Sequence, residues 1–180
     1  MGPMRRAIAS VAVLTTMVAC TSAGGDTKVR VTPAVNATDV PGLPASTTAL
    51  PDVTYAQFHE LLGRLRGVPV VLNVWGSWCG PCREEGPRLA AAARTYGHRV
   101  QFLGLDVKDD KGPAQKFIQE MGWTYPSVFD PSPTANVETQ LGWRAQPVTL
   151  FYDSSGKIVD QVSGPVTAAD LRSGIGKILA

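Results

Sequence analysis

The segment Trp78-Cys79-Gly80-Pro81-Cys82 (WCGPC) follows closely on the apolar run Pro69–Trp75 (PVVLNVW). This run is short, uninterrupted and rich in valine, which predicts a buried strand. A helix is expected from Cys79 to Tyr96, so that Cys79 stands at its N-terminus. Free N–H groups and the helix dipole favour an anion at that position, and the sequence therefore predicts that Cys79 populates its reactive thiolate.

The second cysteine, Cys82, is expected one helical turn further on, where it can attack a mixed disulfide formed on Cys79. Trp78 is expected to shield one side of the pair. A zinc site would need a second pair of ligands, whereas His59 and His98 are isolated. A purely structural disulfide over so short a loop would stabilise little. The pattern therefore favours a redox-active disulfide, with no metal and no cofactor.

The folded domain is expected over residues 52–180, where helices alternate with strands. Thr54 and Gln57 resemble a capping box at the start of an amphipathic helix, and Thr167 is expected to cap the last helix. A helix that includes residues 114–121 should stop at Gly122. Periodicity also predicts strands over 100–105, 148–152 and 157–162, and a short helix over 134–141. The first two strands should pair in parallel and the last two as a hairpin, which predicts a three-layer α/β domain with a mixed sheet.

The N-terminal residues are interpreted as an export signal followed by a tether. Arg5 and Arg6 precede a mostly apolar run of 13 residues, which is shorter than the about 20 residues of a membrane-spanning helix. Residues 1–19 are therefore predicted to be a signal peptide, and Val18-Ala19-Cys20 resembles the lipobox of bacterial lipoproteins, which implies a lipid on Cys20. An ordinary signal peptide or an uncleaved short anchor are the alternatives. Residues 20–51 have the composition of a flexible linker.

Composition excludes two broad classes of protein. Hydrophobic residues make up 44% of the 180-residue chain and charged residues 18%, so a packed core is expected rather than general disorder. The net charge is +2 without a run of five or more like charges, which argues against a nucleic-acid partner.

The cysteine motif and its surroundings resemble the TlpA/ResA-like branch of exported thioredoxins. After WCGPC the sequence continues Arg83-Glu84-Glu85-Gly86-Pro87, and Asn73 occupies the strand position where cytosolic thioredoxins carry a buried Asp. The segment 105–130 is similar to the central insertion of this branch, and Gln146-Pro147 matches the cis-proline position of the superfamily. The resemblance implies a thioredoxin-like α/β/α fold with a mixed central sheet and a central helical insertion.

The resemblance also implies roles for individual residues. Cys79 would be the nucleophile and Cys82 the resolving cysteine. A cis Pro147 would place the backbone of Gln146 against the dithiol, where it pairs with substrate. Glu85, or an acidic residue of the insertion such as Asp109, would tune proton transfer to Cys82. The alternatives are a solvated helix face for Glu85 and a plain edge-strand proline for Pro147.

The function implied is that of a thiol-disulfide oxidoreductase tethered by lipid to the outer face of the bacterial cytoplasmic membrane. Its substrates would be exported proteins with disulfides, notably the heme-binding cysteines of apocytochrome c, and a membrane electron-transfer protein would recharge the dithiol. Cys-Gly-Pro-Cys favours the reducing direction. The alternatives are a net oxidase of exported proteins, and a binding module or metallochaperone that uses the same fold without turnover.

Overall fold

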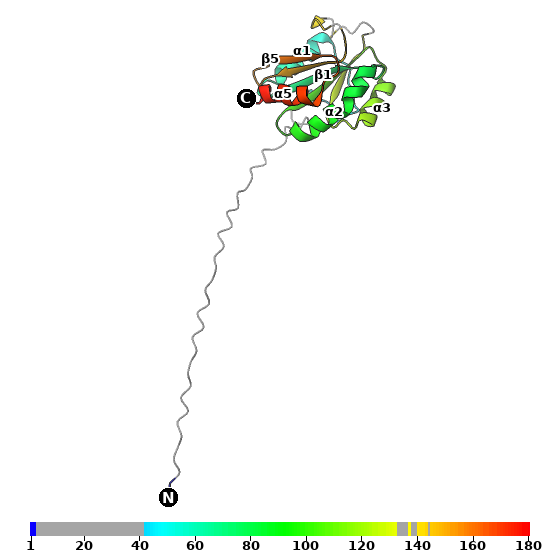
Figure 1. Ribbon diagram of the computed structural model, residues 1–180. Helices are drawn as coiled ribbons and strands as arrows, with labels where there is room; N and C mark the ends of the chain where they lie inside the picture. Colours follow the sequence, from blue (N-terminus) through cyan, green and yellow to red (C-terminus); the bar gives the residue numbers. More distant parts are fainter. Residues whose placement is uncertain (3–41, 133–136, 138–139, 144) are drawn as a thin grey trace. The chain divides into compact units, whose positions relative to one another are not determined.

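The computed structural model describes residues 1–2, 42–132, 137, 140–143 and 145–180 of the chain (Figure 1). Its centre is a five-stranded sheet in the order β3-β2-β1-β4-β5. Strand β1 pairs in parallel with β2, as β2 does with β3, whereas the pairs β1–β4 and β4–β5 are antiparallel. The elements, in chain order, are α1 (Tyr55–Arg64), β1 (Val70–Trp75), α2 (Gly80–Tyr96), β2 (Gln101–Val107), α3 (Lys111–Met121), β3 (Ser127–Asp130), β4 (Val148–Tyr152), β5 (Ile158–Ser163) and α5 (Ala168–Ile178).

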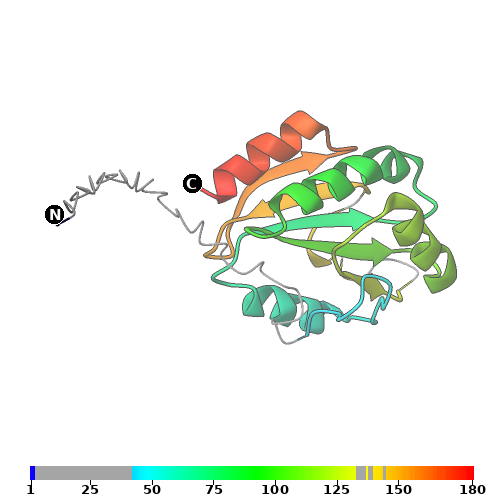
Figure 2. The same cartoon turned by 90° about the horizontal axis from the view of Figure 1, so that it is seen from below.

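Helices cover both faces of the sheet, which Figure 2 shows with α1 on one side and α2 and α5 on the other. Strand β1 is buried along its whole length. Its side chains belong to two hydrophobic cores, one on each face of the sheet. Val71 and Trp75 pack with apolar residues of α2, α3 and α5, whereas the alternate residues Val70, Leu72 and Val74 pack with α1. The expected three-layer α/β architecture with a mixed sheet is therefore confirmed.

Local sequence signals set the ends of the helices. Thr54 and Gln57 form the expected capping box on α1, and Thr167 forms one with Asp170 on α5. Gly122 ends α3 in the left-handed conformation with φ 63°, which a residue without a Cβ adopts at little cost. These caps satisfy backbone groups that a helix end leaves unpaired.

The structure differs from the sequence prediction at the edge of the sheet. Strand β3 was not expected as a strand, because its four residues lie in the segment 105–130, which was interpreted as the central insertion. It becomes a strand through parallel pairing with β2, in which Gly104 lies opposite Ser127. Strand β2 runs to Val107, two residues beyond its expected end. The short helix expected over 134–141 lies mostly outside the described residues.

The packed domain also begins before the expected boundary at residue 52. Leu43 and Leu50 are buried, although both fall in the expected linker. The neighbouring segment is tied to β3, since Phe129 N–H donates to the Pro51 carbonyl and Val53 N–H to the Phe129 carbonyl. The expected signal peptide and Cys20 lie outside the described residues. Within the part that is described, no helix is both long and apolar enough to cross a membrane.

Candidate active site

Cys79 and Cys82 lie at the N-terminal end of α2, shortly after β1, and they are joined by a disulfide with 5.2 Å between their Cα atoms. Cys79 is the N-cap of α2, and its sulfur accepts a hydrogen bond of 3.2 Å from the Cys82 N–H. Pro81 lies in the first turn of the helix, where its missing N–H leaves no bond unmade. Both cysteines are buried. The sulfur of Cys79 therefore sits among the free N–H groups of the helix, which favour a thiolate.

Trp78 lies on the surface next to the disulfide, with 55% of its area exposed. Its indole nitrogen lies against Gly76, where a Cβ would come within 2.7 Å of it. Gly76 thus allows the indole to fold back toward the strand. The large exposed aromatic surface is suited to contact with a substrate.

The Gln146–Pro147 peptide bond is cis, as the resemblance implies. Pro147 is buried and immediately precedes β4, whose first residue Val148 pairs with Val74 near the end of β1. This pairing brings the segment beside the end of the strand that leads to Cys79. The Pro147 carbonyl accepts a hydrogen bond from Gly164 N–H. Gln146 is partly buried, and its side-chain nitrogen has no hydrogen-bond partner among the described residues.

Glu85 is buried in the middle of the domain, so the alternative of a solvated helix face is wrong. One carboxyl oxygen accepts a hydrogen bond of 2.7 Å from the Asn73 side-chain nitrogen, and the other accepts one of 2.7 Å from Val166 N–H. Burial raises the pKa of Glu85 to about 7, against the opposing effect of these two hydrogen bonds and of the Arg88 charge. Glu85 follows Cys82 by three residues on α2, so their side chains share one helix face. A carboxyl group that gains and loses a proton near neutral pH therefore lies one turn from Cys82.

Asp109 contacts Ser77, in the segment that precedes Cys79. Its carboxylate accepts hydrogen bonds from the backbone N–H of Ser77 and, at 2.9 Å, from the Ser77 hydroxyl. The structure therefore separates the two acidic candidates. Glu85 lies on the buried face of α2, whereas Asp109 supports the turn that precedes Cys79.

Two further residues of this region were not expected as site residues. Thr149 of β4 contacts Asn73 through a side-chain hydrogen bond of 3.2 Å, which extends the Glu85–Asn73 pair across the sheet. Asp106 of β2 is fully buried. In the sequence, Asp106 directly follows the strand expected over 100–105, and nothing in its spacing marked it as buried.

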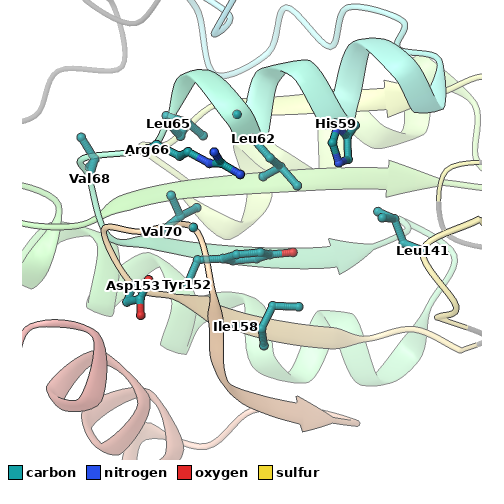
Figure 3. Close-up of a pocket in the computed structure, with 12 residues that line it drawn as sticks. His59, Leu62, Leu65, Arg66, Val68, Val70, Leu141, Tyr152, Asp153 and Ile158 are labelled. Carbon is teal, nitrogen blue, oxygen red and sulfur yellow. The ribbon is translucent and has the colours of Figure 1, made fainter.

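The histidines are remote from the disulfide in the fold. His59 is an exposed residue of α1 and lines a cavity of about 330 Å³ with Arg66, Tyr152 and residues of the β4–β5 turn (Figure 3). This cavity lies on the α1 side of the sheet, whereas both cysteines belong to the core on the α2 side. His98 follows the C-terminal end of α2. Neither histidine belongs to the candidate site.

A disulfide at the start of a helix, approached by a cis-proline segment on a mixed five-stranded sheet, places the chain among thioredoxin-like proteins. The AhpC/TSA family matches residues 41–161, and the chain belongs to this family. Relatives confirm the resemblance to its TlpA/ResA-like members. The thiol-disulfide oxidoreductase ResA of Geobacillus thermodenitrificans is 32% identical over 114 residues, which cover 63% of this chain and 64% of that protein. The thiol:disulfide interchange protein DsbE of Allochromatium vinosum is 33% identical over 126 residues, covering 69% and 67%.

Solved structures give the same placement. A putative DsbE from Chlorobium tepidum matches with a TM-score of 0.59 and 27% identity over 66% of this chain and 85% of that one. A DsbF homologue from Corynebacterium diphtheriae matches with a TM-score of 0.56 and 34% identity, over 64% and 75%. The chain spans less than two thirds of several curated relatives, for example 60% of a DsbE homologue from Paracoccus denitrificans. The similarity therefore concerns the thioredoxin-like domain.

Proposed function

We propose that this protein is an extracytoplasmic thiol-disulfide oxidoreductase that reduces disulfides of exported proteins. The observation that supports this most directly is the disulfide between Cys79 and Cys82 at the N-terminus of α2. The names of its relatives, which are thiol-disulfide oxidoreductases and interchange proteins, support the same chemistry. The geometry favours Cys79 as the nucleophile, because its sulfur accepts the N–H bond at the helix start.

The reaction begins with the reduced dithiol. The Cys79 thiolate attacks one sulfur of a substrate disulfide, so that a mixed disulfide forms and the other substrate sulfur leaves as a thiolate. Cys82 then loses its proton and attacks the Cys79 sulfur, which releases the second substrate sulfur. Two electrons pass to the substrate, which becomes a dithiol, and the Cys79–Cys82 disulfide remains. Trp78 and the backbone of Gln146 hold the substrate chain beside Cys79 during both steps.

Glu85 is assigned the proton transfer that the second step requires. Its pKa of about 7 means that both protonation states are populated near neutral pH. As a carboxylate it can accept the Cys82 proton, directly or through a water molecule. The hydrogen bonds from Asn73 and Val166 keep its carboxyl group in one orientation.

Electrons must be supplied for each turnover, and we assign this role to a membrane electron-transfer protein. The substrate class proposed is exported protein disulfides such as those of the heme-binding cysteines of apocytochrome c. A reductant outside the cytoplasm must keep its thiols reduced in an oxidising compartment. A low reduction potential is therefore the property that separates this function from that of a net oxidase.

The reduction potential of the Cys79–Cys82 pair should lie near that of thioredoxin, roughly −270 mV, and far from the value of about −120 mV of a strong oxidant. Equilibration with glutathione buffers, followed by quantification of free thiols, measures it. Cys82→Ser, which cannot close the disulfide, is the matched control for thiols outside the site. A potential close to −120 mV, with normal maturation of c-type cytochromes in a deletion strain, would support the oxidase. A dithiol that never exchanges with protein disulfides would support the binding module.

We also propose that Cys20 is lipidated, which keeps the domain at the outer face of the membrane. The support is the sequence Val18-Ala19-Cys20 after a short apolar run. Cys20→Ala should move the protein from the membrane pellet to the soluble fraction, whereas Cys79→Ala should leave it in the pellet. A Cys20→Ala protein that stays in the membrane would point to an uncleaved anchor.

A further inference from the structure

A cavity on the α1 side of the sheet has no part in the proposed reaction. Its volume is about 330 Å³, within the range of roughly 300–1,000 Å³ that is typical of small-molecule sites. Residues of α1 and of the segment after it form one wall, and Tyr152, Ile158 and the β4–β5 turn form the other (Figure 3). Cys79 and Cys82 belong to the core on the opposite face of the sheet. A molecule bound in the cavity would therefore not contact the disulfide.

Apolar side chains line both walls of the cavity, and part of their surface is open to water. Leu62 and Leu141 are only partly buried, and Ile158 is 42% exposed. Figure 3 shows Leu62 on the helix side of the cavity and Ile158 on the strand side. An apolar group placed between these side chains would remove their surface from water, which favours binding. The walls therefore suit a ligand with an apolar body.

Arg66 brings a positive charge to the cavity. Among the described residues its guanidinium forms no ion pair and no hydrogen bond. Its side chain lies across Gly156 of the β4–β5 turn, where a Cβ would come within 3.4 Å of the Arg66 Cγ and Nε atoms. Gly156 has a φ of 84°, which a residue without a Cβ adopts at little cost. The turn therefore leaves room for the arginine at the cavity.

The other polar side chains of the cavity leave this charge available to an anion. Asp153 lines the cavity, but its Oδ1 atom accepts hydrogen bonds from the N–H and hydroxyl groups of Ser155 and from the Lys157 N–H. Its carboxylate therefore stabilises the β4–β5 turn. Burial raises the pKa of Tyr152 to about 12, so this hydroxyl is uncharged at neutral pH and does not repel an anion. The imidazole of His59 carries no negative charge either.

We propose that this cavity is a binding site for a small carboxylate with an apolar body. The carboxylate pairs with the Arg66 guanidinium, whose parallel N–H groups match its two oxygens. The apolar body lies between Leu62 and Ile158. The cavity volume is near the lower end of the range for ligand sites, which limits the ligand to a small molecule. Binding at this place does not depend on the direction or the substrate of the redox reaction.

The test uses the oxidised full chain and phenylpropionate as the ligand, and follows binding through the backbone amide NMR signals. The signals of Gly63, Arg66 and Gly156 should shift in a saturable way with a Kd of about 1 mM or lower, whereas those of Trp78 and Cys79 should not move. Acetate lacks the apolar body and phenylpropionamide lacks the charge. Each should bind about tenfold more weakly than phenylpropionate or worse. An amide that binds as tightly as the carboxylate would overturn the proposal.

Arg66→Gln should weaken the binding of phenylpropionate about tenfold, because it removes the charged donor. Arg66 is exposed, so this change leaves the core intact. Arg64→Gln is the matched control. Arg64 carries the same charge but pairs with Glu60 and does not line the cavity, so the Kd should stay within about twofold of wild type.

Three outcomes of these titrations would contradict the proposal. The first is a set of shifts that do not saturate or that centre on Trp78, and the second is an equal effect of the two arginine variants. The third is a pentapeptide ending in phenylalanine that binds about tenfold tighter than phenylpropionate. The occupant would then be the C-terminus of a peptide rather than a small molecule.

Discussion

Cys79→Ser should lower the rate of disulfide reduction by about a thousandfold or more, because a serine hydroxyl at neutral pH cannot replace the thiolate nucleophile. Cys82→Ser should have a different effect. Its Cys79 can still attack the substrate, but the mixed disulfide has no resolving thiol and should accumulate. The measurement is turnover of a disulfide-bonded substrate with a dithiol reductant, together with non-reducing gels that detect the trapped complex.

The two variants control for each other, since both change one sulfur to oxygen and both abolish the internal disulfide. Iodoacetamide should modify Cys79 faster than Cys82 in the reduced wild-type protein, because Cys79 is the N-cap residue of α2 and Cys82 lies within the helix. Trapped substrate on Cys82 in the Cys79→Ser protein, with none on Cys79 in the Cys82→Ser protein, would reverse the two roles.

Glu85→Gln should remove a pH-dependent contribution of about 3 kcal/mol to the free energy of unfolding. This contribution arises because the pKa of Glu85 is about 7 in the native state and 4.5 ordinarily. The native protein binds this proton more tightly than the unfolded chain. Stability from this group is therefore fully present below about pH 4.5 and is lost as the pH rises through about 7. The variant lacks the ionisable group, so its free energy of unfolding should rise relative to that of wild type as the pH increases from 4 to 8.

Urea unfolding of the oxidised proteins at both pH values measures this difference. Glu84→Gln is the matched control, because Glu84 is the exposed neighbour on the same helix and should show no such change. The kinetics give a second readout. If Glu85 accepts the Cys82 proton, the rate of the resolving step should rise with pH through about 7 in wild type and lose this dependence in Glu85→Gln. A difference in stability that is independent of pH would contradict the assignment.

The sequence by itself determined the elements whose signals are local. The apolar run that became β1, the cysteines at the start of α2 and the capping boxes at Thr54 and Thr167 are all read within a few neighbouring residues. Such signals act through backbone conformation and the burial of one face. The elements can therefore be predicted without knowing which distant residues they contact. For the same reason the mixed sheet with helices on both faces could be predicted from the order of the elements.

The tertiary structure alone decided which polar groups became buried and what they contact. Glu85 could not be distinguished from a solvated residue, because its partners come from β1 and from Val166, a residue 81 positions away. Strand β3 has only four residues and exists through its pairing with β2. In the sequence Asp106 cannot be distinguished from an exposed acidic residue near a strand end. It is buried because β2 pairs with β1 on one side and with β3 on the other. In each case the free energy depends on desolvation and on long-range contacts, and neither is encoded in the spacing of neighbouring residues.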